Sequence, residues 1–159
     1  MIVLIERLLI IMKKFKLLFL IVLSIFLVGC ANSKTSITGD KFMKEMSDLG
    51  YSVKDVLSNY DYAVSAYNAY KGDISVFFLK GKKKYDVEGV FLDEYQNLYN
   101  EIGEKFEKKL TNGTDWTSLI LKNDETVNYI SWIKDSYIII KAPKSNLNEV
   151  KKVIKTLGY

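Results

Sequence analysis

Residues 62–80, YAVSAYNAYKGDISVFFLK, decide the fold. Lys71-Gly72-Asp73 has the composition of a tight turn, so the stretch predicts a hairpin of strands Tyr62–Tyr70 and Ile74–Lys80. Side chains alternate between the two faces of a strand, and the second strand is apolar on both. Ile74, Val76 and Phe78 fall on one face, and Phe77 and Leu79 on the other. A strand of this kind needs cover on both sides, which predicts a central position in the sheet.

The segment before the hairpin predicts a helix over about Gly39–Leu49. Thr38 is its expected N-cap, because a threonine hydroxyl can accept a hydrogen bond from a backbone N–H of the first turn. Gly50 is its expected stop, because glycine readily adopts the left-handed conformation that follows many helices. The expected apolar face consists of Phe42, Met43, Met46 and Leu49. Tyr51–Leu57 predicts a weak strand.

The segment after the hairpin predicts a long helix over about Asp86–Leu110, with a possible bend at Gly103. The apolar residues recur every three or four positions, which is the helical period. They are Val87, Phe91, Tyr95, Leu98, Ile102, Phe106 and Leu110. Thr111–Asp115 is polar and contains glycine, so it predicts a loop.

The last third of the chain predicts three strands and a helix. The strands are Trp116–Lys122, Thr126–Ile133 and Tyr137–Lys141, with short polar connections between them. Pro143 ends this run. The helix covers about Leu147–Leu157, and Gly158 stops it.

The expected order is therefore α-βββ-α-βββ-α, an α+β fold in which the helices pack on one face of an antiparallel sheet. It forms a single domain over residues 38–159. Residues 42–51 and 150–159 both end in Leu-Gly-Tyr. This repeat leaves two interpretations open: a duplicated unit, or two ordinary helix ends.

Composition excludes several classes of protein. The chain has 159 residues, one cysteine, no histidine and a formal charge of +4. Without residues 1–29, 19 basic side chains face 18 acidic ones, so the net charge falls to +1 and gives no field that attracts nucleic acid. One cysteine and no histidine exclude an internal disulfide, a Cys/His zinc site and a Ser-His-Asp triad. No cofactor and no metal are expected.

Residues 1–29 have the pattern of an export signal. Lys13, Lys14 and Lys16 precede an apolar run over residues 17–28, which is too short for an ordinary bilayer-spanning helix. Leu27-Val28-Gly29-Cys30 then resembles the lipobox of bacterial lipoproteins, in which the first three residues are the signal peptidase recognition site. Cys30 would be the lipid attachment site, and two acyl chains would give stable anchoring.

The lipobox predicts a cell-membrane location at the outer face, with residues 30–37 as a lipid-anchored linker. Its polar segment of six residues, 31–36, reaches at most about 20 Å, so the domain would stay close to the membrane. The alternative is an uncleaved transmembrane helix. Residues 1–11 place a second apolar stretch before the lysines, which indicates that translation starts at Met12.

The region after Cys30 resembles a group of small lipoproteins from Gram-positive, clostridia-like bacteria. The resemblance rests on the lipobox, the helix ending in Gly50-Tyr51, the hairpin, and the terminal Leu157-Gly158-Tyr159. It implies a single α+β domain and a membrane address, and it implies no activity.

Candidate functional residues are few. Tyr67, between small neighbours on the first hairpin strand, is a possible exposed contact of a binding face. Gly81–Lys84 could contact anionic lipids or cell-wall polymers, or be a solvated loop. Asp93-Glu94 and Asp124-Glu125 are adjacent acids, which do not face each other as a catalytic pair must.

The sequence therefore favours a membrane-anchored extracytoplasmic binding or interaction domain without enzymatic activity, whose partner would be a protein, a cell-wall polymer or a small ligand. The alternative is a cell-envelope hydrolase using carboxylates, since glycosidases need neither histidine nor cysteine.

Overall fold

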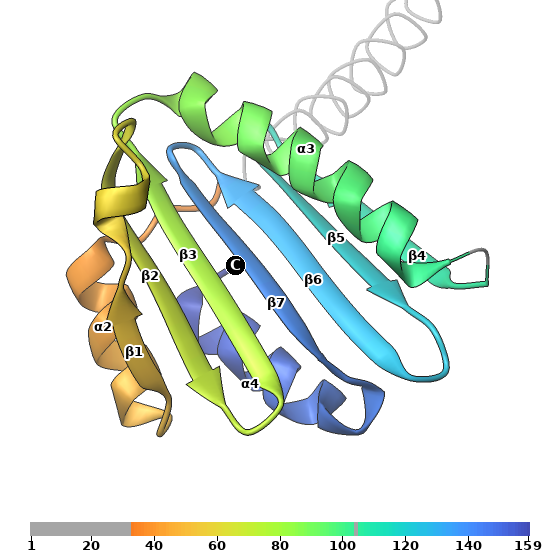
Figure 1. Cartoon of the computed structure of the whole chain (residues 1–159). Coiled ribbons are helices and arrows are strands. Elements are labelled where there is room, and N and C mark those ends of the chain that lie inside the picture. Colours follow the sequence, from red (N-terminus) through yellow and green to blue (C-terminus); the bar gives the residue numbers. More distant parts are fainter. Residues whose placement is uncertain (1–32, 104) are drawn as a thin grey trace, which may run out of the picture. The chain divides into compact units, whose positions relative to one another are not determined.

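The computed structural model describes residues 33–103 and 105–159 (Figure 1). Leu27, Val28, Gly29, Cys30 and the start site Met12 lie outside the described residues. The elements follow in the order α2 (Gly39–Asp48), β1 (Ser52–Asp55), β2 (Ala63–Lys71), β3 (Ile74–Gly81), α3 (Lys84–Ile102), β4 (Glu107–Asn112), β5 (Trp116–Lys122), β6 (Thr126–Ile133), β7 (Ser136–Pro143) and α4 (Leu147–Leu157). Short 3-10 turns cover Leu57–Asn59 and Lys144–Asn146.

Seven strands form one antiparallel sheet in the order β1-β2-β3-β7-β6-β5-β4. The predicted hairpin is confirmed, and β3 lies between β2 and β7 with both of its faces covered. The α+β class is confirmed as well. The predicted element order is wrong by one strand, because β4 was assigned to a helix.

The region 103–112 shows why that assignment failed. Gly103 adopts φ +81°, which ends α3 rather than bending it. Phe106 and Leu110 continue the helical spacing of apolar residues only by coincidence. Residues 107–112 instead pair with β5 along the edge of the sheet, and all six are exposed.

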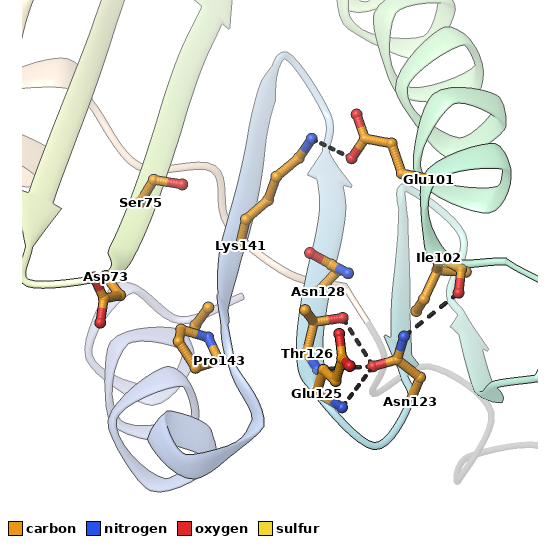
Figure 2. A pocket seen from close by; sticks show the side chains of 11 residues that line it. Asp73, Ser75, Glu101, Ile102, Asn123, Glu125, Thr126, Asn128, Lys141 and Pro143 are labelled. Atoms are coloured by element: carbon orange, nitrogen blue, oxygen red, sulfur yellow. Dashed lines mark hydrogen bonds and ion pairs between the residues drawn. The ribbon is translucent and has the colours of Figure 1, made fainter.

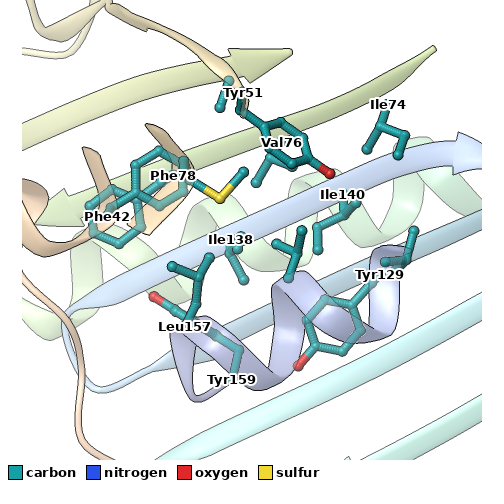
Figure 3. Close-up of a cluster of buried hydrophobic side chains, with 14 of the residues drawn as sticks. Phe42, Tyr51, Ile74, Val76, Phe78, Tyr129, Ile138, Ile140, Leu157 and Tyr159 are labelled. Atoms are coloured by element: carbon teal, nitrogen blue, oxygen red, sulfur yellow. The ribbon is translucent and has the colours of Figure 1, made fainter. Parts of the chain in front are cut away.

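The helices cover both faces of the sheet, so the prediction of one covered face is wrong (Figure 1). We call the face under α2 and α4 the two-helix face; Phe78, Ile138 and Ile140 are buried there with Phe42 of α2 and Leu157 of α4 (Figure 3). The other is the one-helix face. There Leu79, Tyr137 and Ile139 are buried with Leu98 of α3. Both groups of buried side chains lie within residues 37–159, so this region contains its own core.

The predicted capping residues of α2 and α4 are confirmed. The Thr38 hydroxyl accepts a hydrogen bond from the Lys41 amide at 3.2 Å. Gly50 and Gly158 follow α2 and α4 with φ of +80° and +78°. Met43 is 42% exposed, so it does not belong to the buried face of α2.

Candidate functional site

Four lysines surround a groove of about 410 Å³ on the two-helix face. Lys151 and Lys155 lie one turn apart on α4, Lys109 lies on β4, and Lys34 precedes α2. The groove opens here because α4 covers β7, while the β4–β5 edge of the sheet extends beyond the helix. We call this site the lysine groove.

The floor of the lysine groove is aromatic and apolar. It includes Trp116 and Ile120 of β5 and Tyr129 of β6. The Lys34 Nζ lies 4.2 Å from the centre of the Trp116 ring, a cation–π contact. Burial lowers the pKa of Lys34 from its ordinary value. A lysine that has lost part of its hydration is well placed to receive an anion.

The buried hydroxyls beneath the groove are joined in a chain of hydrogen bonds. Tyr129 donates to the Ser118 Oγ at 3.0 Å, and the Ser118 and Ser131 Oγ atoms are 2.9 Å apart. Ser131 donates to the Thr117 carbonyl at 2.7 Å, which uses its single proton. Ser118 is therefore the donor to Ser131. The hydroxyl groups of this part of the floor are therefore hydrogen-bonded within the protein.

The charge of the groove is not balanced within the described part of the chain. None of its lining side chains is an aspartate or a glutamate, and none of the four lysines forms an ion pair with an acidic side chain of residues 33–103 or 105–159. Six other lysines do form such pairs: Lys44, Lys71, Lys80, Lys122, Lys141 and Lys144. Converging positive charges over an apolar floor suit an organic anion.

A second concavity of about 430 Å³ lies on the one-helix face near the end of α3 (Figure 2). We call it the polar pocket. Its charged lining residues are Asp73, Glu101, Glu125 and Lys141, and its asparagines are Asn123 and Asn128. The Lys141 Nζ donates to the Glu101 carboxylate at 2.8 Å.

Tyr67 is not the exposed contact that its small neighbours predict. The Tyr67 ring is half-buried below α2 and stacks on Phe42, with 6.0 Å between ring centres. Val64 on the expected core side is instead 50% exposed, as is Tyr70 at 48%. A bulge between Ala63 and Ser65 shifts the register of β2. Beyond the bulge the pairing with β3 is regular, so Tyr67 lies beside Phe78 on the face under α2 and Tyr70 lies beside Ser75 on the opposite face.

The lysines of Gly81–Lys84 have roles at the start of α3. Lys82 donates to the Asp61 carbonyl, and the Lys83 amide is held by the Asp86 carboxylate at 3.0 Å. The Lys84 Nζ lies 5.3 Å from the centre of the Trp132 ring. Of the acidic pairs, Asp93-Glu94 lies on α3 and Asp124-Glu125 in a turn, as expected.

Sequence reasoning missed both concavities. Lys34 was assigned to the linker and Lys109 to a helix, so only the Lys151–Lys155 pair could have been noticed. For the polar pocket, a signal was present: Asn128 interrupts the apolar strand TVNYISWI. In the described residues no group of three or more His, Cys, Asp or Glu side chains could hold a metal ion. No helix among them has the length and hydropathy needed to cross a membrane.

Comparisons with known proteins add little. No protein-family model matches the chain, and no curated protein matches its sequence. Among solved structures, a GTP binding regulator from Thermotoga maritima is similar to this chain at 12% identity and a TM-score of 0.47, over 77% of this chain and 88% of that one. A likeness this distant carries no argument about function.

Proposed function

We propose that the protein is a lipid-anchored, extracytoplasmic binding domain that takes an organic anion in the lysine groove. The observation that carries the binding role is the groove itself, with four lysines that form no ion pair within the described residues around an aromatic floor. A phosphate or carboxylate group would be held by the ammonium groups, and an attached apolar group would lie on Trp116 and Ile120.

The proposed address rests on the signal sequence and on Cys30. Lys34 follows Cys30 by four residues, which span at most about 14 Å. A lipid on Cys30 would therefore keep the lysine groove close to the membrane surface, where ligands of the cell envelope are found.

Phenyl phosphate is a suitable probe of the groove. Phenol and inorganic phosphate are the controls for the aromatic ring and the phosphate group of this probe. The protein to use starts at residue 30 and carries Cys30→Ser, because residues 37–159 contain the core. We expect the Trp116 indole resonance to shift in an NMR titration with phenyl phosphate. Lys151→Gln with Lys155→Gln should weaken binding about tenfold, because about 1.4 kcal/mol of charge attraction is lost.

Lys152→Gln is the matched control, since Lys152 is exposed on the same helix and does not line the groove. It should leave the affinity unchanged. Equal weakening by Lys152→Gln would show that only the overall charge matters, and unaltered binding in the double variant would remove the groove from the proposal.

The anchor is tested separately in cells. Inhibiting the lipoprotein signal peptidase should leave a heavier precursor, and Cys30→Ser should release the protein from membranes or leave it unprocessed. A Cys30→Ser protein that is still membrane-bound and cleaved after Gly29 would contradict lipidation.

A cell-envelope hydrolase remains the second candidate, and the polar pocket is the observation that favours it, because Glu101 and Glu125 both line one concavity. The Glu101 carboxylate is held by Lys141 in this structure. Hydrolysis of a cell-wall glycan that Glu101→Gln and Glu125→Gln each abolish would favour the enzyme over a binding domain.

A further inference from the structure

The Asn128 side chain is largely buried, and it lines the polar pocket with no hydrogen-bond partner among the described residues. It is 8% exposed, and it lies on β6 among residues that are buried. Its side-chain amide forms no hydrogen bond within the described part of the chain. Neither amide atom is among the fully buried atoms without a partner, so both are accessible from the pocket. A ligand that enters the pocket can therefore hydrogen-bond to them.

The amide of Asn128 belongs to the polar pocket. Figure 2 shows it between the Lys141–Glu101 ion pair and the turn that carries Asn123. Asn123 does not have the same freedom, because its Oδ1 already accepts from the Glu125 amide at 2.9 Å and from the Thr126 amide at 2.7 Å. Asn128 is therefore the asparagine of the pocket that is available to a ligand.

The charge of the pocket restricts the class of ligand. Asp73, Glu101 and Glu125 outweigh Lys141, so the pocket repels the anions that the lysine groove attracts. A primary amide offers donors and an acceptor side by side, and another carboxamide matches both at once. Carboxylates at the rim accept hydrogen bonds from hydroxyl groups, and the Ser75 hydroxyl can add a further contact.

We propose that the polar pocket is a second ligand site, which binds an N-acetylated sugar with its acetamido group paired to the Asn128 amide. The acetamido carbonyl accepts from the Asn128 Nδ2, and its N–H donates to the Oδ1. The ring hydroxyls lie toward Glu101 and Glu125. This site is on the opposite face from the lysine groove, so the two ligands bind without competition.

The test is an NMR titration of the chain that starts at residue 30 with Cys30→Ser, using N-acetylglucosamine as the probe. We expect the Asn128 side-chain resonances to shift and to saturate. Glucose, which lacks the acetamido group, should bind at least about tenfold more weakly. N-acetylalanine methylamide, which carries amides and no sugar hydroxyls, should also bind more weakly; if it binds more tightly than the sugar, the ligand is a peptide and the proposal is wrong.

Asn128→Leu is the decisive variant. It removes an amide that makes no hydrogen bond to the described residues, so the protein should still fold, while binding of N-acetylglucosamine is lost. Asn68→Leu is the matched control, because Asn68 lies on the same sheet face on β2 and outside the pocket. It should bind the sugar like the parent protein. Undiminished binding by Asn128→Leu, or no saturable shift in the parent protein, would overturn the proposal.

Measuring phenyl phosphate binding in the same variants tests the lysine groove separately from the polar pocket. Asn128→Leu should bind phenyl phosphate normally, and the double Lys151→Gln and Lys155→Gln variant should bind N-acetylglucosamine normally. Loss of both ligands in either variant would show that the two concavities are not independent sites.

Discussion

The lysine groove and the polar pocket lie on opposite faces of one sheet, and they differ in how their buried polar groups are satisfied. Beneath the lysine groove, Tyr129, Ser118 and Ser131 hydrogen-bond to one another, and the cations gather at the rim. In the polar pocket the cation is paired, while the Asn128 amide faces the pocket and makes no hydrogen bond to the described residues. The two proposed sites therefore differ: one would recognise its ligand by charges above a satisfied floor, and the other by a side-chain amide of the floor itself.

The two faces also differ in cover. The two-helix face carries α2 and α4, while α3 alone covers part of the one-helix face. Truncating two neighbouring residues of one strand should therefore lower the free energy of unfolding by different amounts. The predictions below test that difference, beginning with the largest expected effect.

Phe78 and Phe77 are adjacent on β3 and point to opposite faces. Phe78 is fully buried and stacks on Phe42, with 4.7 Å between ring centres, while Phe77 is half-buried against Tyr60 and Tyr137. Phe78→Ala should lower the free energy of unfolding by about 3–5 kcal/mol, and Phe77→Ala by about 1–2 kcal/mol. Urea unfolding measures both. Equal losses of unfolding free energy in the two variants would show that α3 buries its face of the sheet as effectively as α2 and α4 bury theirs.

High pH should weaken the two-helix face through its tyrosines. Burial and the nearby Glu149 raise the pKa of Tyr51 to about 12, and burial also raises the pKa of Tyr159. A tyrosine with a raised pKa in the folded state contributes stability that is present below pH 10 and is lost as the pH rises toward 12. The free energy of unfolding should fall over this range, and it should fall less steeply, by about 1 kcal/mol per pH unit, in Tyr51→Phe.

The measurement is urea unfolding at a series of pH values, with tyrosinate absorbance followed in parallel. If the free energy of unfolding falls with the same slope in Tyr51→Phe and in the parent protein between pH 10 and 12, ionisation of Tyr51 does not destabilise the folded state.

The smallest effect is expected from two tyrosine hydroxyls on opposite faces. The Tyr159 hydroxyl donates to the Ser136 Oγ at 2.6 Å, whereas the buried Tyr137 hydroxyl has no partner in the described residues. Tyr159→Phe should cost about 1 kcal/mol, because Ser136 loses its donor. Tyr137→Phe should be neutral or stabilising. Both variants are compared by thermal unfolding. A larger loss of stability for Tyr137→Phe than for Tyr159→Phe would mean that ordered water hydrogen-bonds to the Tyr137 hydroxyl.

The sequence by itself determined the local structure of the domain. The bounds of β5, β6 and α4 match the prediction residue by residue, and the hairpin and the stops at Gly50 and Gly158 are as expected. These features depend on chemistry between near neighbours, such as turn composition, a capping hydroxyl and a residue that tolerates positive φ. They are therefore written into short stretches of sequence.

Only the tertiary structure decided which face each element covers and what gathers there. Pairing with β3 set Tyr67 beside Phe78 under α2, and pairing with β5 made a strand of residues whose spacing suited a helix. The lysine groove collects side chains from the segment before α2, from β4 and from α4, which are far apart in the chain. Asn128 joins the polar pocket because the pairing of β6 with β7 sets it beside Lys141. Both sites arise from contacts between distant segments, whose free energy depends on the packed arrangement and leaves no short pattern in the sequence.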